Sequence, residues 1–283
     1  MRFGIAGLQV GAGCEPDGLA RVARLAEDAG FESLWPPEHV VVPAHVTSRY
    51  PFNAEGRLRN NPTIPRPDPL MWLAFAAAAT SRIKLGTGVL LLPLRNPVLL
   101  AKETATLARL SGGRLILGIG LGWMREEYDV LASNWSDRGR RTEEYIAVLR
   151  ELWQPGPRSF AGPTVCFENV HCSPAPGADG IPVVISGTSE AAARRAGRLA
   201  DGYFPMAVTP ARLRELIAVA KGEAELAGRP PGCLEITYQG PPDPAEIEAA
   251  RDAGVDRYVV LDQSADFAGD PRRLTGLAQS LSL

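Results

Sequence analysis

The chain has 283 residues, 45% of them hydrophobic, and its 30 basic and 32 acidic side chains give a formal net charge of −2. This composition is sufficient for a large core, and the lack of excess positive charge argues against a nucleic-acid or acidic-membrane partner. The longest strictly apolar run, residues 70–79, is too short to span a membrane, and the N-terminus does not resemble a signal peptide, so we expect a cytoplasmic protein.

The predicted elements alternate between short apolar strands and helices. A strand over 2–10 leads to a helix from Pro16 to Gly30, and a second strand spans 33–35. After a proline-rich segment, 40–68, the expected order is helix 69–79, strand 83–92, helix 97–110, strand 115–120 and helix 138–153. A Pro- and Gly-rich segment, 154–181, precedes strands 182–186, 202–206, 234–238 and 257–262, which alternate with helices 189–200, 210–227, 244–253 and a last one from 271.

Eight strands, each followed by a helix, predict parallel strands with right-handed crossovers. The pattern fits one (β/α)8 TIM barrel domain over residues 1–283, with insertions after strands 2 and 4. A doubly wound open sheet is the alternative. Its nucleotide-binding fingerprint is absent, because Trp123 stands where the third glycine of GxGxxG would fall.

Glycine is concentrated at the ends of strands, where the active site of such a barrel lies. The third predicted strand contains Gly86 and Gly88, and the fourth ends in Gly118, Gly120 and Gly122. Glycine inside a strand often marks a bulge or the close approach of another molecule. Together these residues favour a planar ligand that lies against bare backbone, although relief of crowding inside the barrel explains any single glycine equally well.

The fifth strand runs into Ser186, Gly187, Thr188 and Ser189 at the start of an Ala-rich helix. Free N–H groups and the positive end of the helix dipole favour a phosphate there. Ordinary capping by Thr188 or Ser189 is the alternative. The four cysteines and three histidines show no metal-ligand spacing, so we expect free thiols and no metal site.

The segment 40–68 is too long for an ordinary connection and is interpreted as a substrate lid. Glu126 and Glu127 are interpreted as helix-start charges and are left outside the site. The side chains expected to contact the substrate come from this lid and from the strand ends, and each aromatic among them is also explained as core: Arg49, Tyr50, Phe52, Gln9, Trp35 and Trp123.

Several motifs resemble the luciferase-like monooxygenase superfamily. They are AEDAGFESLWPPEHV at 26–40, the stretch 85–131, the helix RGRRTEEYIAVLRELW and ISGTSEAAARRAGRLADGYFP. These motifs occur in the family's order and cover residues 1–205, and they look most like the branch that uses the deazaflavin coenzyme F420 rather than FMN.

The resemblance implies a flavin-like ring across the strand ends and a non-proline cis peptide at Gly88–Val89 behind it. It assigns cofactor contacts to Thr87, Gly88, Val89, Gly120, Ser186, Gly187 and Thr188. It also assigns the family's histidine to His39, and it is compatible with a homodimer. One departure is clear: the branch that oxidises glucose 6-phosphate has a glutamate after GxGxG where this chain has Trp123, which disfavours a sugar-phosphate dehydrogenase.

The function expected from the resemblance is hydride transfer between F420 and a small organic substrate. His39 is the expected catalytic residue, donating a proton while a C=C, C=N or C=O bond is reduced. A histidine that only contacts the ring or caps the strand is equally consistent with the sequence. The alternative functions are an FMN-dependent monooxygenase supplied with reduced flavin by another protein, and a non-catalytic barrel that binds a ligand.

Overall fold

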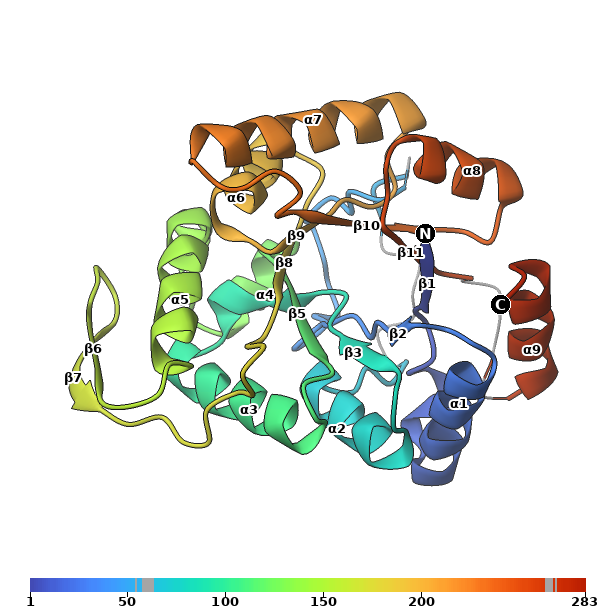
Figure 1. The fold of residues 1–283 in the computed structure, drawn as a ribbon, viewed down its shortest axis with the longest axis horizontal. Helices are drawn as coiled ribbons and strands as arrows, with labels where there is room; N and C mark the ends of the chain where they lie inside the picture. Colours follow the sequence, from blue (N-terminus) through green and yellow to red (C-terminus); the bar gives the residue numbers. More distant parts are fainter. Residues whose placement is uncertain (54, 58–63, 263–266, 268) are drawn as a thin grey trace.

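The computed structural model describes residues 1–53, 55–57, 64–262, 267 and 269–283. Eight parallel strands close into a barrel with helices packed around it (Figure 1). The barrel strands are β1 (Arg2–Ile5), β2 (Ser33–Leu34), β3 (Lys84–Gly86), β5 (Leu115–Gly120), β8 (Val183–Ser186), β9 (Gly202–Phe204), β10 (Glu235–Gly240) and β11 (Arg257–Val260). The ring closes where β3 pairs with β5, so the predicted (β/α)8 TIM barrel is confirmed and the open sheet is excluded.

The helices around the barrel begin at strong start signals. Proline opens most of them, and a side-chain oxygen such as that of Asp68, Asn96 or Thr209 caps the first turn. The predicted helices are confirmed as α1 (Pro16–Asp28), α2 (Pro69–Ala79), α3 (Pro97–Leu110), α5 (Arg138–Leu152), α6 (Glu190–Leu199), α7 (Pro210–Leu226), α8 (Pro244–Asp252) and α9 (Pro271–Ser280).

The structure departs from the predicted strands near β1 and near β3. The strand expected over 83–92 is interrupted, because β3 ends at Gly86 and pairing resumes only at β4 (Leu90–Leu91), before the 3-10 helix η2 (Leu92–Leu94). The Gly88–Val89 peptide in this break is cis, as expected. β1 also ends early and is followed by the 3-10 helix η1 (Gly11–Cys14).

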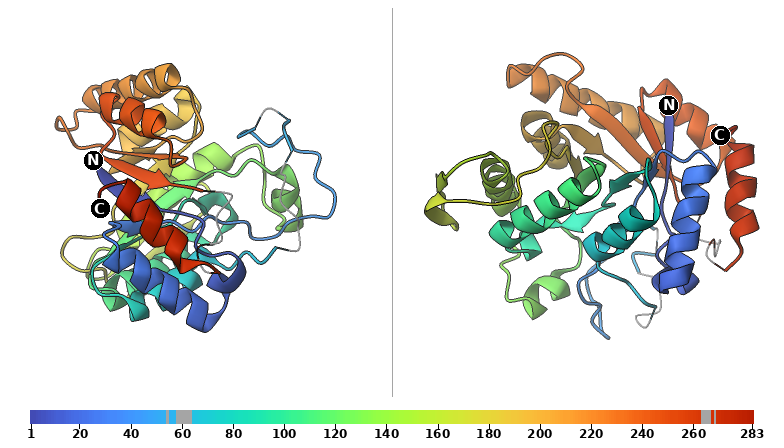
Figure 2. Two further views of the ribbon diagram at one scale, coloured as in Figure 1. Left: turned by 90° about the vertical axis from the view of Figure 1, so that its right-hand side faces the viewer. Right: turned by 60° about the horizontal axis from the view of Figure 1, so that its bottom comes forward.

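The part of the chain after β5 contains structure that the sequence did not reveal. The segment 154–181 forms an antiparallel hairpin of β6 (Arg158–Ala161) and β7 (Cys166–Val170), which projects outward beside α5 (Figure 1). A short helix, α4 (Arg125–Val130), precedes α5. The segment that follows β2 extends away from the barrel on the same side as α4 (Figure 2).

The barrel interior is packed around Trp35. Its side chain is 1% exposed, meets Phe204 edge-on at 5.2 Å and donates from Nε1 to Ser33 Oγ at 2.8 Å. A Cβ added at Gly86 would lie 2.6 Å from the indole, and one at Gly4 would lie 2.7 Å from it. These glycines therefore make room for Trp35, which fills the barrel core. The prediction that Trp35 contacts the substrate is wrong, because its side chain is enclosed by the core.

Gly118 tests this packing. We expect Gly118→Ala to lower the free energy of unfolding by about 3 kcal/mol, since overpacking a core is destabilising and the added methyl would lie 2.0 Å from the Thr87 carbonyl oxygen. The control is Gly222→Ala in α7, where no atom lies within 4 Å of the new methyl; it should raise that free energy by about 1 kcal/mol. Urea unfolding measures both. A Gly118→Ala protein as stable as the wild type would contradict the expected clash.

Candidate active site

A cavity of about 1510 Å³ lies at the C-terminal end of the barrel strands. This volume exceeds the ~300–1,000 Å³ of ordinary ligand pockets, so the cavity has room for more than one small ligand. The cavity brings together most of the predicted site residues: Gln9, His39, Tyr50, Phe52, Gly88, Val89, Gly120, Trp123, Ser186, Gly187 and Thr188.

Three predicted site residues are not on the wall of this cavity. Trp35 lies in the barrel core. Thr87 is fully buried, and its hydroxyl donates to the Gly118 carbonyl oxygen at 2.6 Å, so it supports the strand. Arg49 is exposed and folds across Gly56. The side chains of Trp35 and Thr87 are therefore enclosed by protein, whereas the substrate contact expected of Arg49 stays a prediction. Within the predicted lid, residues 54 and 58–63 lie outside the described part of the chain.

An aromatic wall covers one side of the cavity. The ring centroids of His39 and Trp123 are 6.0 Å apart, those of Trp123 and Tyr50 5.1 Å, and those of Tyr50 and Phe52 5.4 Å. All three contacts are edge-to-face, the arrangement that aromatic quadrupoles favour. Burial raises the pKa of the Tyr50 hydroxyl, which therefore stays protonated near neutral pH. The lid and the loop after β5 thus meet over the cavity.

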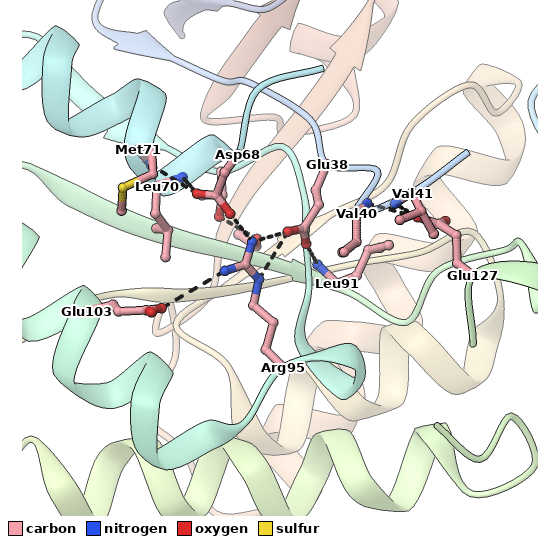
Figure 3. Close-up of polar contacts among 12 residues, drawn as sticks. Glu38, Val40, Val41, Asp68, Leu70, Met71, Leu91, Arg95, Glu103 and Glu127 are labelled. Atoms are coloured by element: carbon pink, nitrogen blue, oxygen red, sulfur yellow. Dashed lines mark hydrogen bonds and ion pairs between the residues drawn. The ribbon is translucent and has the colours of Figure 1, made fainter. Parts of the chain in front are cut away.

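His39 is held by Glu127, whose side chain is 1% exposed. The Nδ1 atom of His39 lies 3.0 Å from Glu127 Oε2. The other oxygen of this carboxylate, Oε1, accepts the backbone N–H of Val40 at 2.9 Å (Figure 3). No hydrogen bond from the described residues reaches Nε2 of His39. A hydrogen-bond partner on one ring nitrogen of a histidine fixes the tautomer and the orientation of the ring. Glu127 occupies Nδ1 of His39 in this way, so Nε2 is available to a ligand.

Glu127 is therefore part of the site, and its interpretation as a helix-start charge alone is corrected. The contact joins residues 88 positions apart, so no local pattern around Glu127 could have revealed it. Its neighbour Glu126 also holds the lid. Oε1 of Glu126 accepts the backbone N–H and the hydroxyl of Thr47, both at 2.6 Å, and the N–H of Ser48 at 2.9 Å.

The Glu126 contact is expected to depend on pH. Burial alone would raise the pKa of this carboxyl group, but hydrogen bonds from Thr47 and Ser48 lower it to about 2. Since the pKa in the unfolded chain is ~4.3, the carboxylate stabilises the folded protein at neutral pH, and this contribution declines as pH falls from ~4.3 towards 2.

Urea unfolding of the wild type and Glu126→Ala from about pH 7 to about pH 3.5 tests this expectation. The difference in free energy of unfolding should be largest at neutral pH and should shrink on acidification. Glu225→Ala, at an exposed position of α7, is the control and should give a constant difference. A constant difference for Glu126→Ala as well would contradict the assignment.

A buried ion network fixes the residue before His39. Glu38 is 6% exposed and accepts from the Leu91 N–H at 2.5 Å and from Arg95 Nε at 3.0 Å (Figure 3). The same guanidinium bonds Asp68, whose carboxylate caps α2 by accepting the N–H groups of Leu70 and Met71. Arg95 therefore joins the two ends of the segment that contains His39 and the lid.

The predicted phosphate residues lie on the cavity wall at the start of α6. Ser189 is the N-cap, with Oγ accepting from Ala192 N at 3.2 Å, so the capping alternative is correct for that residue. Ser186, Gly187 and Thr188 precede it on the wall. A Cβ added to Gly187 would lie 2.6 Å from the Ala192 Cβ, so this turn has no space for a larger residue.

Two arginines that were not singled out from the sequence line the same cavity. The guanidinium carbon of Arg138 lies 3.7 Å from the centroid of the Trp135 ring. Its buried Nε donates no hydrogen bond to the described residues. Arg195 bonds Glu143 at 3.0 Å and is 12% exposed. Guanidinium groups and a helix N-terminus on one cavity suit an anionic group of a ligand.

Other kinds of site are not formed by the described residues. No three His, Cys, Asp or Glu side chains there gather as metal ligands would. The four cysteines are free thiols. No helix in the described ranges combines the length and apolar character of a membrane span.

Comparison with known proteins places this site in context. The sequence model of a family described as luciferase-like monooxygenase matches residues 1–280. An uncharacterized protein of Mycobacterium tuberculosis H37Rv is 33% identical over 208 residues, 74% of this chain and 72% of that protein. An F420-dependent glucose-6-phosphate dehydrogenase of Kineococcus radiotolerans is 30% identical over 229 residues, 79% of this chain and 63% of that protein.

Solved structures share the fold at low identity. An F420-dependent secondary alcohol dehydrogenase, in complex with an F420-acetone adduct, superposes with a TM-score of 0.78 and 20% identity, covering 99% of this chain and 98% of that one. The FMN-bound oxygenating constituent of 3,6-diketocamphane monooxygenase from Pseudomonas putida superposes with a TM-score of 0.74 and 17% identity. The superposition covers 100% of this chain and 96% of that one.

Proposed function

Because the chain belongs to the luciferase-like monooxygenase family, we propose that it is an oxidoreductase that uses coenzyme F420 to reduce a C=C, C=N or C=O bond of a small organic substrate. The F420-dependent relatives at 30 and 31% identity support this choice of cofactor. The observation that carries the reaction is the His39–Glu127 pair, which holds a histidine on the cavity wall with Nε2 available to a ligand.

The residues present fit a deazaflavin and its phosphate. Gly88, Val89 and Gly120 would lie against the ring, because all three line the cavity at the ends of neighbouring strands. Gly120 also packs against Val89, since a Cβ there would lie 2.5 Å from the Val89 side chain. Gly187 and Thr188, with Ser186 adjacent, would bind the phosphate, and Arg138 and Arg195 would add positive charge. When bound, the reduced deazaflavin supplies the hydride.

The chain itself supplies the proton and the positioning. In its doubly protonated form, with Nδ1–H donated to Glu127, His39 would give its Nε2 proton to the substrate atom next to the carbon that accepts the hydride. One hydride and one proton then add across the double bond, and His39 is left as the neutral imidazole. Glu127 holds the imidazole in place through Nδ1. Trp123 stands where the glucose 6-phosphate branch has its glutamate, so His39 acts without that acid and a sugar phosphate is not the proposed substrate.

The family's description favours a second candidate, an FMN-dependent monooxygenase on the same barrel that takes reduced flavin from another protein. Titration of the purified protein with F420 and with FMN, followed by tryptophan fluorescence, separates the two. Trp123 lies on the cavity wall and should report binding. We expect F420 to saturate at the lower concentration, and saturation by FMN alone would overturn the first proposal.

The reaction class is tested with reduced F420 and a panel of enones, imines and ketones. Oxidation of F420, followed by its visible absorbance, should occur with members of this panel.

Riboflavin, which lacks the phosphate, is the control ligand for the phosphate site and should bind more weakly than FMN if the start of α6 holds a phosphate. Binding of cofactor with no turnover of any panel member would instead favour a non-catalytic ligand-binding barrel.

A further inference from the structure

The side chain of Gln9 is a buried amide without a protein partner. It is 8% exposed, its Oε1 is buried, and among the described residues no hydrogen bond reaches either atom of the amide. Its backbone carbonyl, in contrast, accepts from Cys14 Sγ at 2.7 Å. An unmade hydrogen bond of a buried polar group costs about 1–3 kcal/mol, so such groups require an explanation, and a ligand is one.

Gln9 lies at the same end of the cavity as His39. Gln9 follows β1 and His39 follows β2, and these neighbouring parallel strands pair Gly4 with Ser33 and Ile5 with Leu34. The predicted phosphate residues follow β8, which lies across the barrel from β1 in the strand order (Figure 1). The Gln9 amide therefore belongs to the part of the cavity beside the proton donor, away from the phosphate end.

The two arginines near this end of the cavity, Arg66 and Arg95, each lie close to a carboxylate. Arg66 lines the same wall; burial lowers the pKa of its guanidinium, and the nearby Glu127 carboxylate opposes that shift. Glu38 is paired with Arg95. A carboxylate or phosphate on the substrate would be repelled by the Glu127 carboxylate near Arg66 and would still lose its hydration. A neutral polar group is the better match.

We propose that Gln9 is a specificity-determining residue, whose amide hydrogen-bonds a neutral carbonyl or carboxamide group of the substrate beside His39. An amide side chain offers an acceptor next to two donors, so it forms two bonds with a carboxamide and one with a ketone or enone. This inference rests on the proposed function, because it assumes that the His39 end of the cavity holds the substrate and the β3, β5 and β8 ends hold the cofactor.

Two nearly isosteric probes test the proposal, cyclohex-1-ene-1-carboxamide and cyclohex-1-ene-1-carboxylate. Their dissociation constants are measured by ligand-observed NMR with the F420-loaded protein. The wild type should bind the carboxamide at least about tenfold more tightly than the carboxylate. Gln9→Leu should lose about tenfold for the carboxamide and leave the carboxylate and the F420 affinity unchanged. Val10→Ala, at a neighbouring wall residue, is the control and should change both probes equally.

Thermal unfolding gives a second readout that needs no ligand. Because Gln9→Leu removes a buried amide without a partner, its unfolding midpoint should rise above that of the wild type. A lower midpoint would mean that the amide has a structural role and would overturn the proposal.

The binding outcomes are equally decisive. Equal binding of the two probes by the wild type, no binding of the carboxamide, or unchanged carboxamide binding in Gln9→Leu would each overturn the role of Gln9. A Gln9→Leu protein with weakened F420 binding and unchanged probe binding would place the amide against the cofactor and overturn the substrate assignment. Failure of the wild type to bind F420 would instead count against the proposed function, so the two failures are distinguishable.

Discussion

Replacing His39 with alanine is expected to lower kcat for substrate reduction by about 10²–10⁴-fold, the range that a positioned proton donor contributes. The dissociation constant of F420 should change little, because the predicted cofactor contacts lie at the ends of β3, β5 and β8. Single-turnover oxidation of reduced F420, with the substrate found in the panel, measures the step directly. Turnover close to that of the wild type would reduce His39 to a ring contact or a strand cap.

Glu127→Gln is the matched variant for this experiment. The substitution keeps an oxygen for the backbone N–H of Val40 but removes the charge beside His39 Nδ1. We expect a loss in kcat of about 10–100-fold, the usual effect of removing a group that orients an active histidine. Adding the Gln substitution to His39→Ala should cost little more, since the two residues act as a unit. Additive losses would show that Glu127 acts independently of His39.

Arg95→Met is expected to lower the free energy of unfolding by about 3–5 kcal/mol, the cost of leaving a buried charge unpaired. Glu38 is 6% exposed and would retain only the Leu91 N–H as a partner among the contacts described above. The double variant Arg95→Met/Glu38→Leu should recover most of the loss, because no buried charge remains. Arg251→Met, at an exposed pair with Glu248, should change stability by less than about 1 kcal/mol.

The effect of Arg95→Met should also depend on pH. Burial raises the pKa of Glu38, and Arg95 opposes that rise. Without Arg95 the folded protein would bind this proton more tightly than the unfolded chain does, so the destabilisation should be greatest at neutral pH and smaller in acid. Urea titrations at several pH values measure this trend. A loss of stability that does not change with pH would show that Glu38 is not the source of it.

The barrel fold could be predicted from the sequence because the patterns that mark its strands and helices are local. Apolar strands and helices opened by Pro with a polar cap, such as Asp68 before Pro69, specify each unit within a few residues. The break after Gly86 was not predicted because residues 83–92 are mostly apolar, with only Lys84 and Thr87 as polar side chains. The expected cis peptide at Gly88–Val89 came only from the family resemblance.

The sequence could place a residue on the cavity wall where that residue lies shortly after a strand end, as His39 lies after β2. It was not predictable where a contact joins distant segments, as Glu127 and His39 do, or where a glycine faces a side chain. Gly86 and Gly118 have the local sequence expected at a ligand site, yet they serve the packing of Trp35 and the β3–β5 contact. Only the spatial neighbour decides between those two roles.

The attachment of both ends of the His39–lid segment to one guanidinium has an evolutionary consequence. Arg95 holds Glu38 before the segment and Asp68 after it, so one side chain fixes both ends, while Glu126 and Glu127 hold its first part. Insertions, deletions and substitutions between these anchors would alter what the cavity accepts while the scaffold and the cofactor end stay constant. Transplanting the counterpart of this segment from a relative, with both anchors intact, would therefore test directly whether the segment sets the substrate range.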